Sequence, residues 1–573
     1  LLFGVFFIRF FYLQIYSQEK YSKRSQDNRI RQTVIQPPRG LIYDRNGVLL
    51  VDNQPSYFIS FIPYEVKDKE FLLDFFNNVL NFNKNYVVKK IHNSRGYKPV
   101  RLMQVDFLGL SIVEENKLDL PGVIYQIEPI RHYPSNVRAS HLLGYTKEID
   151  ERELSLLKNE NYVSGDVIGK QGLEKEYEKS LRGEKGYEYF EVDVQGKVIR
   201  NLGKDWNIPP KQGKDLHLSI DSRLQKVSED LMEGKRGAVV ALDPRNGEVL
   251  ALVSKPDYDP GKITIHLSEK EWKSMVENPD HPLFNRATKS LYPPGSTIKL
   301  IAAFAALNEN IITPEWSVEC NGSFKFGIRR FNCWKPEGHG KLDLLNAIEQ
   351  SCNVYFYKLS LEIGIDIWSD YASRFGFGKK TGIDLPEESA GLIPTRELYD
   401  KKYGKNRWTD GNMLNVVIGQ GEMQSTPLQM AVFAMIIANN GKYYQPHIVR
   451  YIEDRNTGKR IQPRIKFKTV DGIREDVYKI IKEGMYRVVN GVHGTGRLAA
   501  VREVKIAGKT GTAQNPHGND HAWFIGFAPL NNPGIAISVI VENGGAGGGA
   551  AAPLAGKIFK EYFRNVYFAK LKN

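Results

Sequence analysis

The sequence predicts an α+β fold in which helices pack on an antiparallel sheet. Residues 237–243 and 249–254 are strand-like runs, and the Pro-Arg-Asn-Gly sequence at 244–247 between them is typical of a tight turn. Residues 222–233 before this hairpin and the alanine-rich run 300–307 after it have helical patterns. Helices and an antiparallel sheet within one segment form a layered domain.

Length and composition indicate a multidomain protein and exclude a small disulfide-stapled module. The chain has 573 residues, 41% of them hydrophobic, which leaves room for roughly two to four domains with substantial cores. Three cysteines are too few for a disulfide framework. The net charge of +13 comes from scattered basic residues without a nucleic-acid motif, so we expect no nucleic-acid partner but a basic surface that faces an anionic envelope.

Residues 1–16 predict one end of a transmembrane anchor. They are aromatic and apolar apart from Arg9 and Gln14, and a polar stretch follows them. So short a segment cannot cross a bilayer, and we expect it to be the outer half of a longer helix. A buried core helix is the alternative.

Residues 17–215 are expected to form a non-catalytic pedestal and head. Residues 20–60 alternate in a strand-like way around Asn46-Gly47, a hairpin signal, and residues 65–120 carry helical apolar spacing. A second domain is expected over residues 216–573.

Near the C-terminus, residues 545–552 consist of glycine and alanine only, which predicts either a flexible or a closely packed segment. Residues 555–565 have a helical pattern and should close the second domain.

A serine and a lysine one helical turn apart form the first candidate catalytic motif. Pro293 and Pro294 fit just before a helix, so Ser296 falls in its first turn, where free N–H groups favour a developing negative charge. Lys299 lies on the same face, and a desolvated lysine that has lost its proton could take the proton of the serine hydroxyl. Taken alone, the pair could equally be an N-cap serine and a surface lysine.

Two later segments favour the catalytic interpretation. Ser351-Cys352-Asn353 supplies a hydroxyl that could relay a proton and an amide that could hold a substrate. Lys509-Thr510-Gly511-Thr512 lies between two strand-like runs. Its glycine would let a ligand backbone lie close to an edge strand, and its lysine and two threonines could hold a carboxylate. The three motifs occur in this order in β-lactamases and penicillin-binding proteins.

With these motifs the chain resembles a class B penicillin-binding protein over nearly its full length. The resemblance includes residues 36–47 (QPPRGLIYDRNG), the Gly419-Gln420-Gly421 segment and Thr426-Pro427. Residues 334–340 (WKPEGHG) and the Asn-Gly-Gly sequence at 543–545 resemble the elongation type of the family.

The resemblance implies a penicillin-binding, serine-transpeptidase fold: an antiparallel sheet with helices on both faces plus a helical subdomain, preceded by an elongated pedestal and head. It implies that Ser296 attacks the penultimate D-Ala carbonyl of a peptidoglycan stem peptide and that the N–H groups of Ser296 and Thr512 bind the oxyanion. Ser351 would protonate the leaving D-Ala, and Asn353 would hold the donor peptide. Its terminal carboxylate would bind to Lys509, Thr510 and Thr512.

The resemblance also implies cellular partners. The chain would cross-link stem peptides in lateral wall synthesis, react with β-lactams, and work with a SEDS-family glycosyltransferase and other elongation-complex proteins. It would be a single-pass protein of the bacterial inner membrane, with its bulk in the periplasm. No cofactor is expected for catalysis.

Three other functions remain open at this point. The chain could act mainly as a scaffold that activates a SEDS-family polymerase. A serine β-lactamase would be shorter and would need a deacylating base, which we cannot identify. A β-lactam sensor would need a signalling segment, which is not visible.

The cysteines cluster with a histidine in a possible metal site. All three cysteines of the chain fall in the pattern C-x12-C-x5-H-x12-C, formed by Cys320, Cys333, His339 and Cys352. Three thiolates and an imidazole complete a closed tetrahedral zinc site, so we predict a structural zinc. A Cys320–Cys333 disulfide or buried free thiols are the alternatives.

Overall fold

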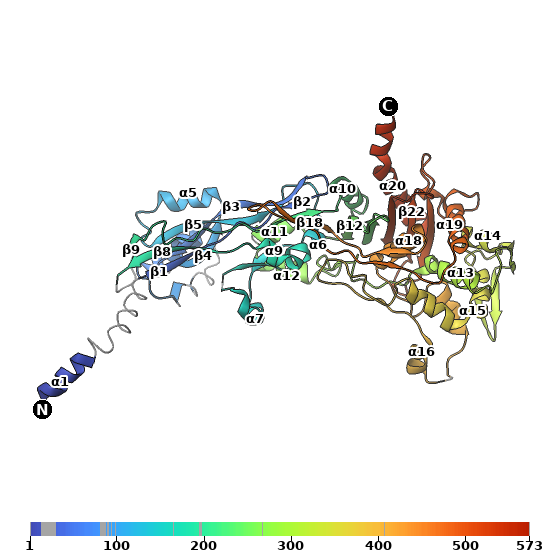
Figure 1. Ribbon diagram of the computed structural model, residues 1–573, viewed down its shortest axis with the longest axis horizontal. Coiled ribbons are helices and arrows are strands. Elements are labelled where there is room, and N and C mark those ends of the chain that lie inside the picture. Colours follow the sequence, from blue (N-terminus) through green and yellow to red (C-terminus); the bar gives the residue numbers. More distant parts are fainter. Residues whose placement is uncertain are drawn as a thin grey trace.

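The computed structural model shows an elongated molecule (Figure 1). Helix α1 (Leu2–Phe11) lies at one end, a strand-rich N-terminal region follows, and most helices of the C-terminal region lie at the other end. The structure describes residues 2–12, 30–80, 88, 91–92, 94–97, 99–163, 165–193, 198–265, 267–405 and 407–571. Within these ranges, no helix combines the length and apolar character that crossing a membrane requires.

Five antiparallel strands form the central sheet of the C-terminal region, in the order β12-β11-β23-β22-β21. Their bounds are β11 (Gly237–Leu242), β12 (Val249–Lys255), β21 (Ala507–Ala513), β22 (His521–Ala528) and β23 (Ile535–Val541). Val240 of β11 packs in a core that includes α18 (Pro427–Ala438), whereas its neighbour Val239 packs in a core that includes α20 (Gly547–Leu571). Helices therefore cover both faces of the sheet, which confirms the predicted α+β fold.

A helical subdomain packs beside β21. It contains α13 (Lys299–Asn308), α14 (Leu344–Glu349), α15 (Asn353–Arg374), α17 (Gly411–Val417) and α19 (Glu475–Asn490). Helix α13 packs on α15, and α19 packs on both α14 and β21. The subdomain therefore lies next to the strand that carries the third motif (Figure 1).

Two larger sheets build the N-terminal region. One has the order β1-β8-β9, and the other has the order β19-β18-β10-β2-β3-β4, with β5 also paired to β3. Their bounds are β1 (Ile30–Ile35), β2 (Ile42–Tyr43), β3 (Leu49–Phe61), β4 (Val100–Val105), β5 (Val123–His132), β8 (Gly186–Val192), β9 (Val198–Asn201), β10 (Asp215–Leu218), β18 (Val449–Asp454) and β19 (Lys459–Ile461). Leu216 pairs with Ile42 on one side and with Ile452 on the other, so one sheet joins residues from both expected domains.

Smaller elements complete the fold. They are α6 (Ser140–Leu143), β6 (Thr146–Glu148), α7 (Glu151–Leu156), β7 (Val167–Gly169), α8 (Gly172–Glu176), α9 (Glu178–Leu181), α11 (Pro260–Ile265), α12 (Glu269–Val276), β13 (Val318–Cys320), β14 (Ser323–Phe326), β15 (Arg329–Asn332), β16 (Gly340–Leu342), α16 (Arg396–Tyr403), β17 (Lys442–Tyr444) and β20 (Phe467–Thr469).

Local predictions hold to different degrees. The helix expected at 222–233 is α10 (Ser222–Leu231), and the carboxylate of Asp221 caps it by accepting two backbone N–H bonds. The region 65–120 contains the helices α3 (Lys69–Asn78) and α5 (Phe107–Glu115), but strand β4 separates them. The expectation of helical structure throughout that region was therefore too broad.

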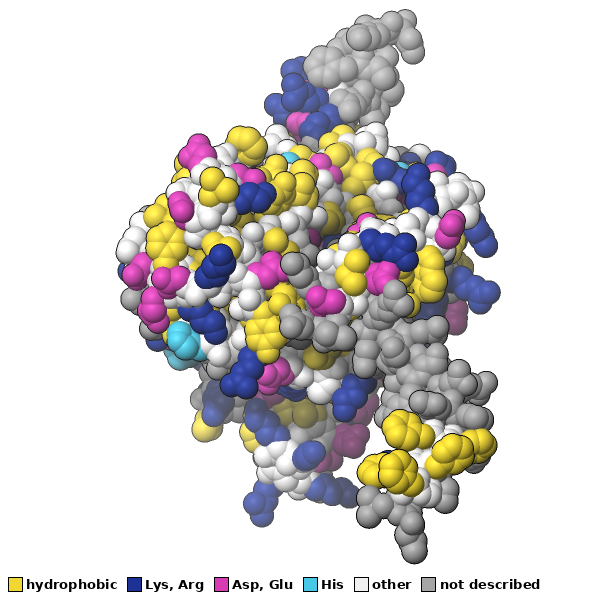
Figure 2. Space-filling model, turned by 90° about the vertical axis from the view of Figure 1, so that its left-hand side faces the viewer, with side chains coloured by type: hydrophobic (Ala, Val, Ile, Leu, Met, Phe, Trp, Pro, Cys, Tyr) yellow, Lys and Arg dark blue, Asp and Glu magenta, His cyan; other side chains and the backbone are white. Residues whose placement is uncertain are grey.

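The surface at the N-terminal end mixes all types of side chain. Figure 2 looks onto this end and shows basic, acidic and hydrophobic side chains interleaved over the head. The phenylalanine side chains of α1 are exposed: Phe3, Phe6, Phe7, Phe10 and Phe11.

Candidate active site

The first motif lies where a tight turn enters α13. Ser296 is in a single 3-10 turn (Gly295–Ile298), and Lys299 is the first residue of the α-helix. Gly295 has a φ of 56°, and its N–H donates to the carbonyl of Gly419 (3.0 Å). Ser296 is half-buried whereas Lys299 is fully buried. The local structure thus places a half-buried serine at the start of a helix whose first residue carries a desolvated amine.

The second motif receives the hydrogen bonds of Lys299. Its Nζ donates to the carbonyl of Ser351 (2.8 Å) and to Asn353 Oδ1 (2.7 Å), and Ser351 Oγ is 3.4 Å away. Ser351 adopts a φ of 55°, in the left-handed region, just before α15 begins at Asn353. Among the described residues, no hydrogen bond joins Lys299 to the Ser296 hydroxyl.

The third motif lies on the edge strand β21 and completes the cluster. Lys509 Nζ donates to Ser351 Oγ at 2.9 Å, so Ser351 lies between two buried lysines. Because β21 ends the order of the sheet, its outer edge remains available to a ligand backbone. The structure therefore brings together the three segments that the sequence singled out.

The glycine of the third motif has a clear packing role. A Cβ on Gly511 would lie 2.9 Å from the carbonyl oxygen of Pro294 and 2.9 Å from Thr297 Cγ2. The strand therefore docks directly on the segment that carries Ser296. The Thr510 hydroxyl bonds to that of Thr495 at 2.7 Å, and Thr512 Oγ1 accepts the N–H of Gly547 at 3.3 Å.

Burial sets the electrostatics of the site. It lowers the pKa of Lys299 to about 8. It also lowers the pKa of Lys509 well below its usual value, with the charge of Lys299 as a second cause. Among the described residues, neither amine has a carboxylate partner that would stabilise its charged form. A neutral lysine is therefore accessible near neutral pH, and it can accept a proton.

Residues near the three motifs also support the site. Gln420 donates to the carbonyl of Thr512 (3.3 Å), so the segment 419–421 backs the first and third motifs. Trp523 is fully buried and donates to the carbonyl of Pro293 (3.0 Å), which makes it a packing residue. His521 is half-buried, and its ring lies edge-on to that of Tyr292.

An ion-pair cluster that the sequence analysis did not predict holds the segment before Ser296. Tyr292 donates to Glu542 (2.6 Å), and Arg286 (2.8 Å) and Arg236 (2.9 Å) pair with the same carboxylate. These residues are too far apart in the chain to show a spacing pattern. The one sequence signal for this cluster is Glu542, which directly precedes the Asn-Gly-Gly sequence at 543–545.

The predicted metal ligands do come together. The ligand atoms of Cys320, Cys333, His339 and Cys352 all lie within 4.8 Å of one another. His339 Nδ1 is 3.5 Å from the sulfurs of both Cys320 and Cys333. All three cysteines are free, so the alternative of a Cys320–Cys333 disulfide was wrong. Three soft thiolates and one imidazole, contributed by three buried cysteines and a half-buried histidine, suit zinc.

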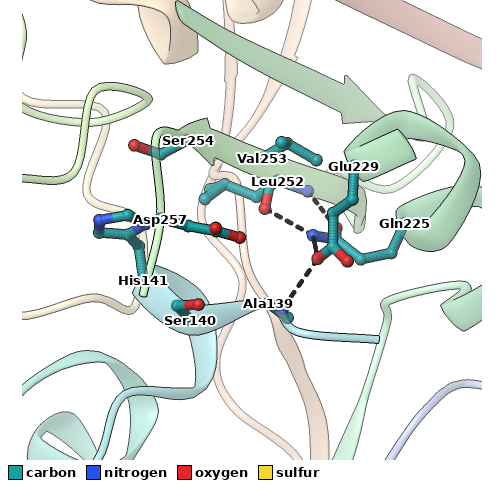
Figure 3. A pocket seen from close by; sticks show the side chains of 9 residues that line it. All are labelled: Ala139, Ser140, His141, Gln225, Glu229, Leu252, Val253, Ser254 and Asp257. Carbon is teal, nitrogen blue, oxygen red and sulfur yellow. Dashed lines mark hydrogen bonds between the residues drawn. The ribbon is translucent and has the colours of Figure 1, made fainter. Parts of the chain in front are cut away.

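A small cavity at the junction of the two regions lies apart from the three motifs (Figure 3). Its space, about 10 Å³, suits one water. Glu229 of α10 accepts the N–H of Ala139 (2.7 Å), and Ala139 has a φ of 38°. Burial raises the pKa of Glu229 and lowers that of His141 to about 4. The cavity marks a polar contact between α6 and the C-terminal region.

Comparison with known proteins identifies both regions. Residues 237–560 match the penicillin-binding protein transpeptidase domain, and residues 34–218 match the penicillin-binding protein dimerisation domain. The chain is 37% identical to the peptidoglycan D,D-transpeptidase MrdA of Haemophilus influenzae, over 98% of this chain and 90% of the relative. It is 36% identical to MrdA of Escherichia coli K12, over 99% and 92%.

Solved structures of related proteins have the same fold. The fold matches PBP2 of Helicobacter pylori, solved in complex with MreC, with a TM-score of 0.79, 30% identity and coverage of 93% of this chain and 99% of that one. It also matches a chain from a peptidoglycan synthase complex that coordinates polymerisation and crosslinking, with a TM-score of 0.74, 29% identity and coverage of 98% and 96%.

Proposed function

Since the chain belongs to the class B penicillin-binding proteins and is a serine-type peptidoglycan D,D-transpeptidase, we propose that Ser296 is its nucleophile. The observation that carries this proposal is the convergence of Lys299, Ser351 and Lys509 next to the turn that carries the half-buried Ser296. We further propose that residues 1–16, 17–215 and 216–573 are the anchor end, the pedestal with head, and the transpeptidase domain.

In the proposed acylation, neutral Lys299 takes the proton of Ser296 as Oγ bonds to the penultimate D-Ala carbonyl carbon. The N–H groups of Ser296 and Thr512 stabilise the oxyanion. The peptide C–N bond then breaks, and Ser351, held between the two lysines, passes a proton to the leaving D-Ala nitrogen. Lys299, which holds the proton taken from Ser296, then replaces the proton of Ser351 and becomes neutral again.

In the proposed deacylation, the amine of a second stem peptide attacks the ester carbon. The new peptide bond forms, the Ser296 C–O bond breaks, and the proton released by the amine returns to Ser296 Oγ. Asn353 would hold the donor peptide, and Thr510, Gly511 and Thr512 would line its terminal residue. A β-lactam would follow the first half of this path and stop at the acyl-enzyme.

Covalent labelling tests the nucleophile. Ser296→Ala should lose the single adduct that a fluorescent penicillin forms, as measured by intact-mass spectrometry. Ser369→Ala, which removes a hydroxyl that bonds only within α15, is the matched control. Stoichiometric labelling of Ser296→Ala would refute the assignment. An adduct that hydrolyses within seconds in the native protein would point to a β-lactamase.

We also propose that the head binds partners of the elongation machinery in lateral wall synthesis, including a SEDS-family glycosyltransferase. The match to PBP2 of Helicobacter pylori, which was solved in complex with MreC, supports a role in binding partners of this kind. On α5, Phe107 and Leu108 are 71% and 68% exposed. Phe107→Ser with Leu108→Ser should abolish co-purification with the polymerase, whereas Ser296→Ala should keep it. The reverse result would exclude this surface.

Helix α1 is proposed to be the periplasmic end of a single-pass inner-membrane anchor, with the bulk of the chain in the periplasm. Its phenylalanines are exposed in the structure, which suits contact with lipid. The full-length protein should resist extraction by alkaline carbonate. Release into the soluble fraction would refute the anchor.

The cysteine cluster is proposed to hold a structural zinc through Cys320, Cys333, His339 and Cys352. When bound, zinc would cross-link these side chains and take no part in the transpeptidation chemistry. Cys352 lies between Ser351 and Asn353, so the cluster ties the second motif to the 320–340 segment. Metal analysis of chelator-free protein should find about one zinc per chain. A value far below that would refute the site.

A further inference from the structure

An isolated hairpin beside the active site carries exposed basic residues. Strands β14 and β15 pair with each other and with no other strand of the described chain. The turn uses Gly327, with a φ of 57°, followed by Ile328, which is fully exposed. In the register, Lys325 lies directly opposite Arg330.

The charges on this hairpin are uncompensated. Like charges directly opposite each other destabilise a strand pair. Among the described residues, Lys325, Arg329 and Arg330 have neither a salt bridge nor a side-chain hydrogen bond. Some exposed arginines elsewhere are paired, as Arg460 is with Glu453. Residues 321–341 contain one acidic residue, Glu337, and the following basic residues: Lys325, Arg329, Arg330, Lys335 and Lys341.

The hairpin is held rigidly against the second motif. The carbonyl of Asn332 accepts bonds from Asn353 Nδ2 (3.3 Å) and the Tyr357 hydroxyl (3.2 Å). Trp334 Nε1 donates to the carbonyl of Gln350 (3.1 Å), one residue before Ser351. The ring of Phe331 packs against Tyr357. Because side chains alternate along a strand, Lys325 and Arg330 face away from the aromatic side toward solvent. Arg329, opposite Phe326, lies on the aromatic side near the turn and is also exposed.

We propose that this basic hairpin binds the carboxylates of stem peptides on the peptidoglycan strand that is being cross-linked. This inference rests on the transpeptidase function and adds a second binding surface for its substrate. Guanidinium groups match carboxylates in geometry and charge. The hairpin packs on α15, at the end of the molecule opposite α1, which disfavours a lipid headgroup as the occupant (Figure 1).

A charge-neutralised variant tests the proposal. Lys325→Gln, Arg329→Gln and Arg330→Gln are combined in one protein. The matched control combines Arg464→Gln, Lys466→Gln and Lys468→Gln, which removes the same charge from an exposed segment that includes part of β20. The probes are purified un-cross-linked peptidoglycan strands and the same strands with amidated carboxylates.

The hairpin variant should bind native strands roughly tenfold more weakly at low salt, because each exposed charge pair contributes a factor of about 1.5 to 5. Its acylation by a fluorescent penicillin should stay within about twofold of the native rate, since none of the three residues touches the three motifs. The native protein should bind amidated strands more weakly than native strands by a similar factor. At about 0.5 M salt, the native protein and the hairpin variant should bind native strands equally.

Several results would overturn the proposal. If the hairpin variant binds native strands as well as the native protein does, the hairpin has no part in substrate recognition. If the control variant loses as much affinity as the hairpin variant, overall charge alone explains the loss. Binding of anionic vesicles that the hairpin variant alone loses would assign the surface to lipid. Loss of acylation in the variant would place the defect in the catalytic site itself. If Ser296→Ala still reacted with the fluorescent penicillin, the catalytic assignment would be wrong. That result would not bear on strand binding by the hairpin.

Discussion

The pH dependence of acylation tests whether Lys299 is the base. With a pKa of about 8, about one tenth of Lys299 is neutral at pH 7 and about nine tenths at pH 9. The second-order rate constant for a fluorescent penicillin should therefore rise roughly tenfold between these values and then level off. A lysine with its ordinary pKa of 10.5 would give a rate that still rises tenfold per unit at pH 9.

The same shift predicts a stability effect. Lowering the pKa of a fully buried lysine from 10.5 to about 8 means that its charged form costs about 3 kcal/mol in the folded state. The folded-state pKa lies below the unfolded one, so the cost is absent above pH 10.5 and complete below pH 8. Relative to Lys299→Met, the native protein should therefore gain about 2 kcal/mol between pH 8 and pH 10.

Two measurements check this reasoning. The first is the pH profile of acylation in native protein and in Lys482→Met, a control in which another lysine with a pKa lowered to about 8 is removed. Lys482 bonds to the carbonyl of Ala438 rather than to a motif, so the profile should not change. The second is chemical denaturation of the native protein and Lys299→Met across pH. A flat rate profile, a break near pH 10, or parallel stability curves would refute Lys299 as a desolvated base.

Three further predictions concern the support of the site. Gly511→Ala should slow acylation and destabilise the fold by about 1–3 kcal/mol, because the added methyl meets Pro294; normal acylation would show that β21 shifts freely. Glu542→Gln should lower the thermal midpoint and slow acylation, at a cost of about 3 kcal/mol, since the buried Arg286 loses its carboxylate partner and Arg236 keeps only Asp280. An unchanged midpoint in calorimetry would contradict this. Cys333→Ser should remove bound zinc and lower the midpoint, and full zinc content in that variant would exclude Cys333 as a ligand.

The convergence of the catalytic motifs could be predicted because each motif combines residue type with local structure. Two prolines place Ser296 at a helix start, and strand-like runs flank the segment 509–512. Strand β4 was missed because the helical spacing of α3 was extended across it. The role of Glu542 could not be predicted, since its partners Tyr292 and Arg286 are distant in the chain and no local pattern records them.

The segment 545–552 was ambiguous for a different reason. Glycine and alanine carry no periodic pattern, and their helix propensities differ widely. In the structure, α20 begins at Gly547, where an added Cβ would lie 2.2 Å from the carbonyl oxygen of Gly511. Small residues are therefore needed for the close approach of α20 to β21, which only the tertiary structure reveals.

The seven-stranded sheet also constrains the order in which the chain can be assembled. Ile42, Leu216 and Ile452 lie side by side in it, although most of the chain separates the first from the last. During synthesis, β2 and β10 can pair early, but β10 keeps an open edge until residue 452 has been made. An unpaired strand edge of this kind invites contact with other chains. The N-terminal region therefore reaches its protected form only when most of the transpeptidase domain is present.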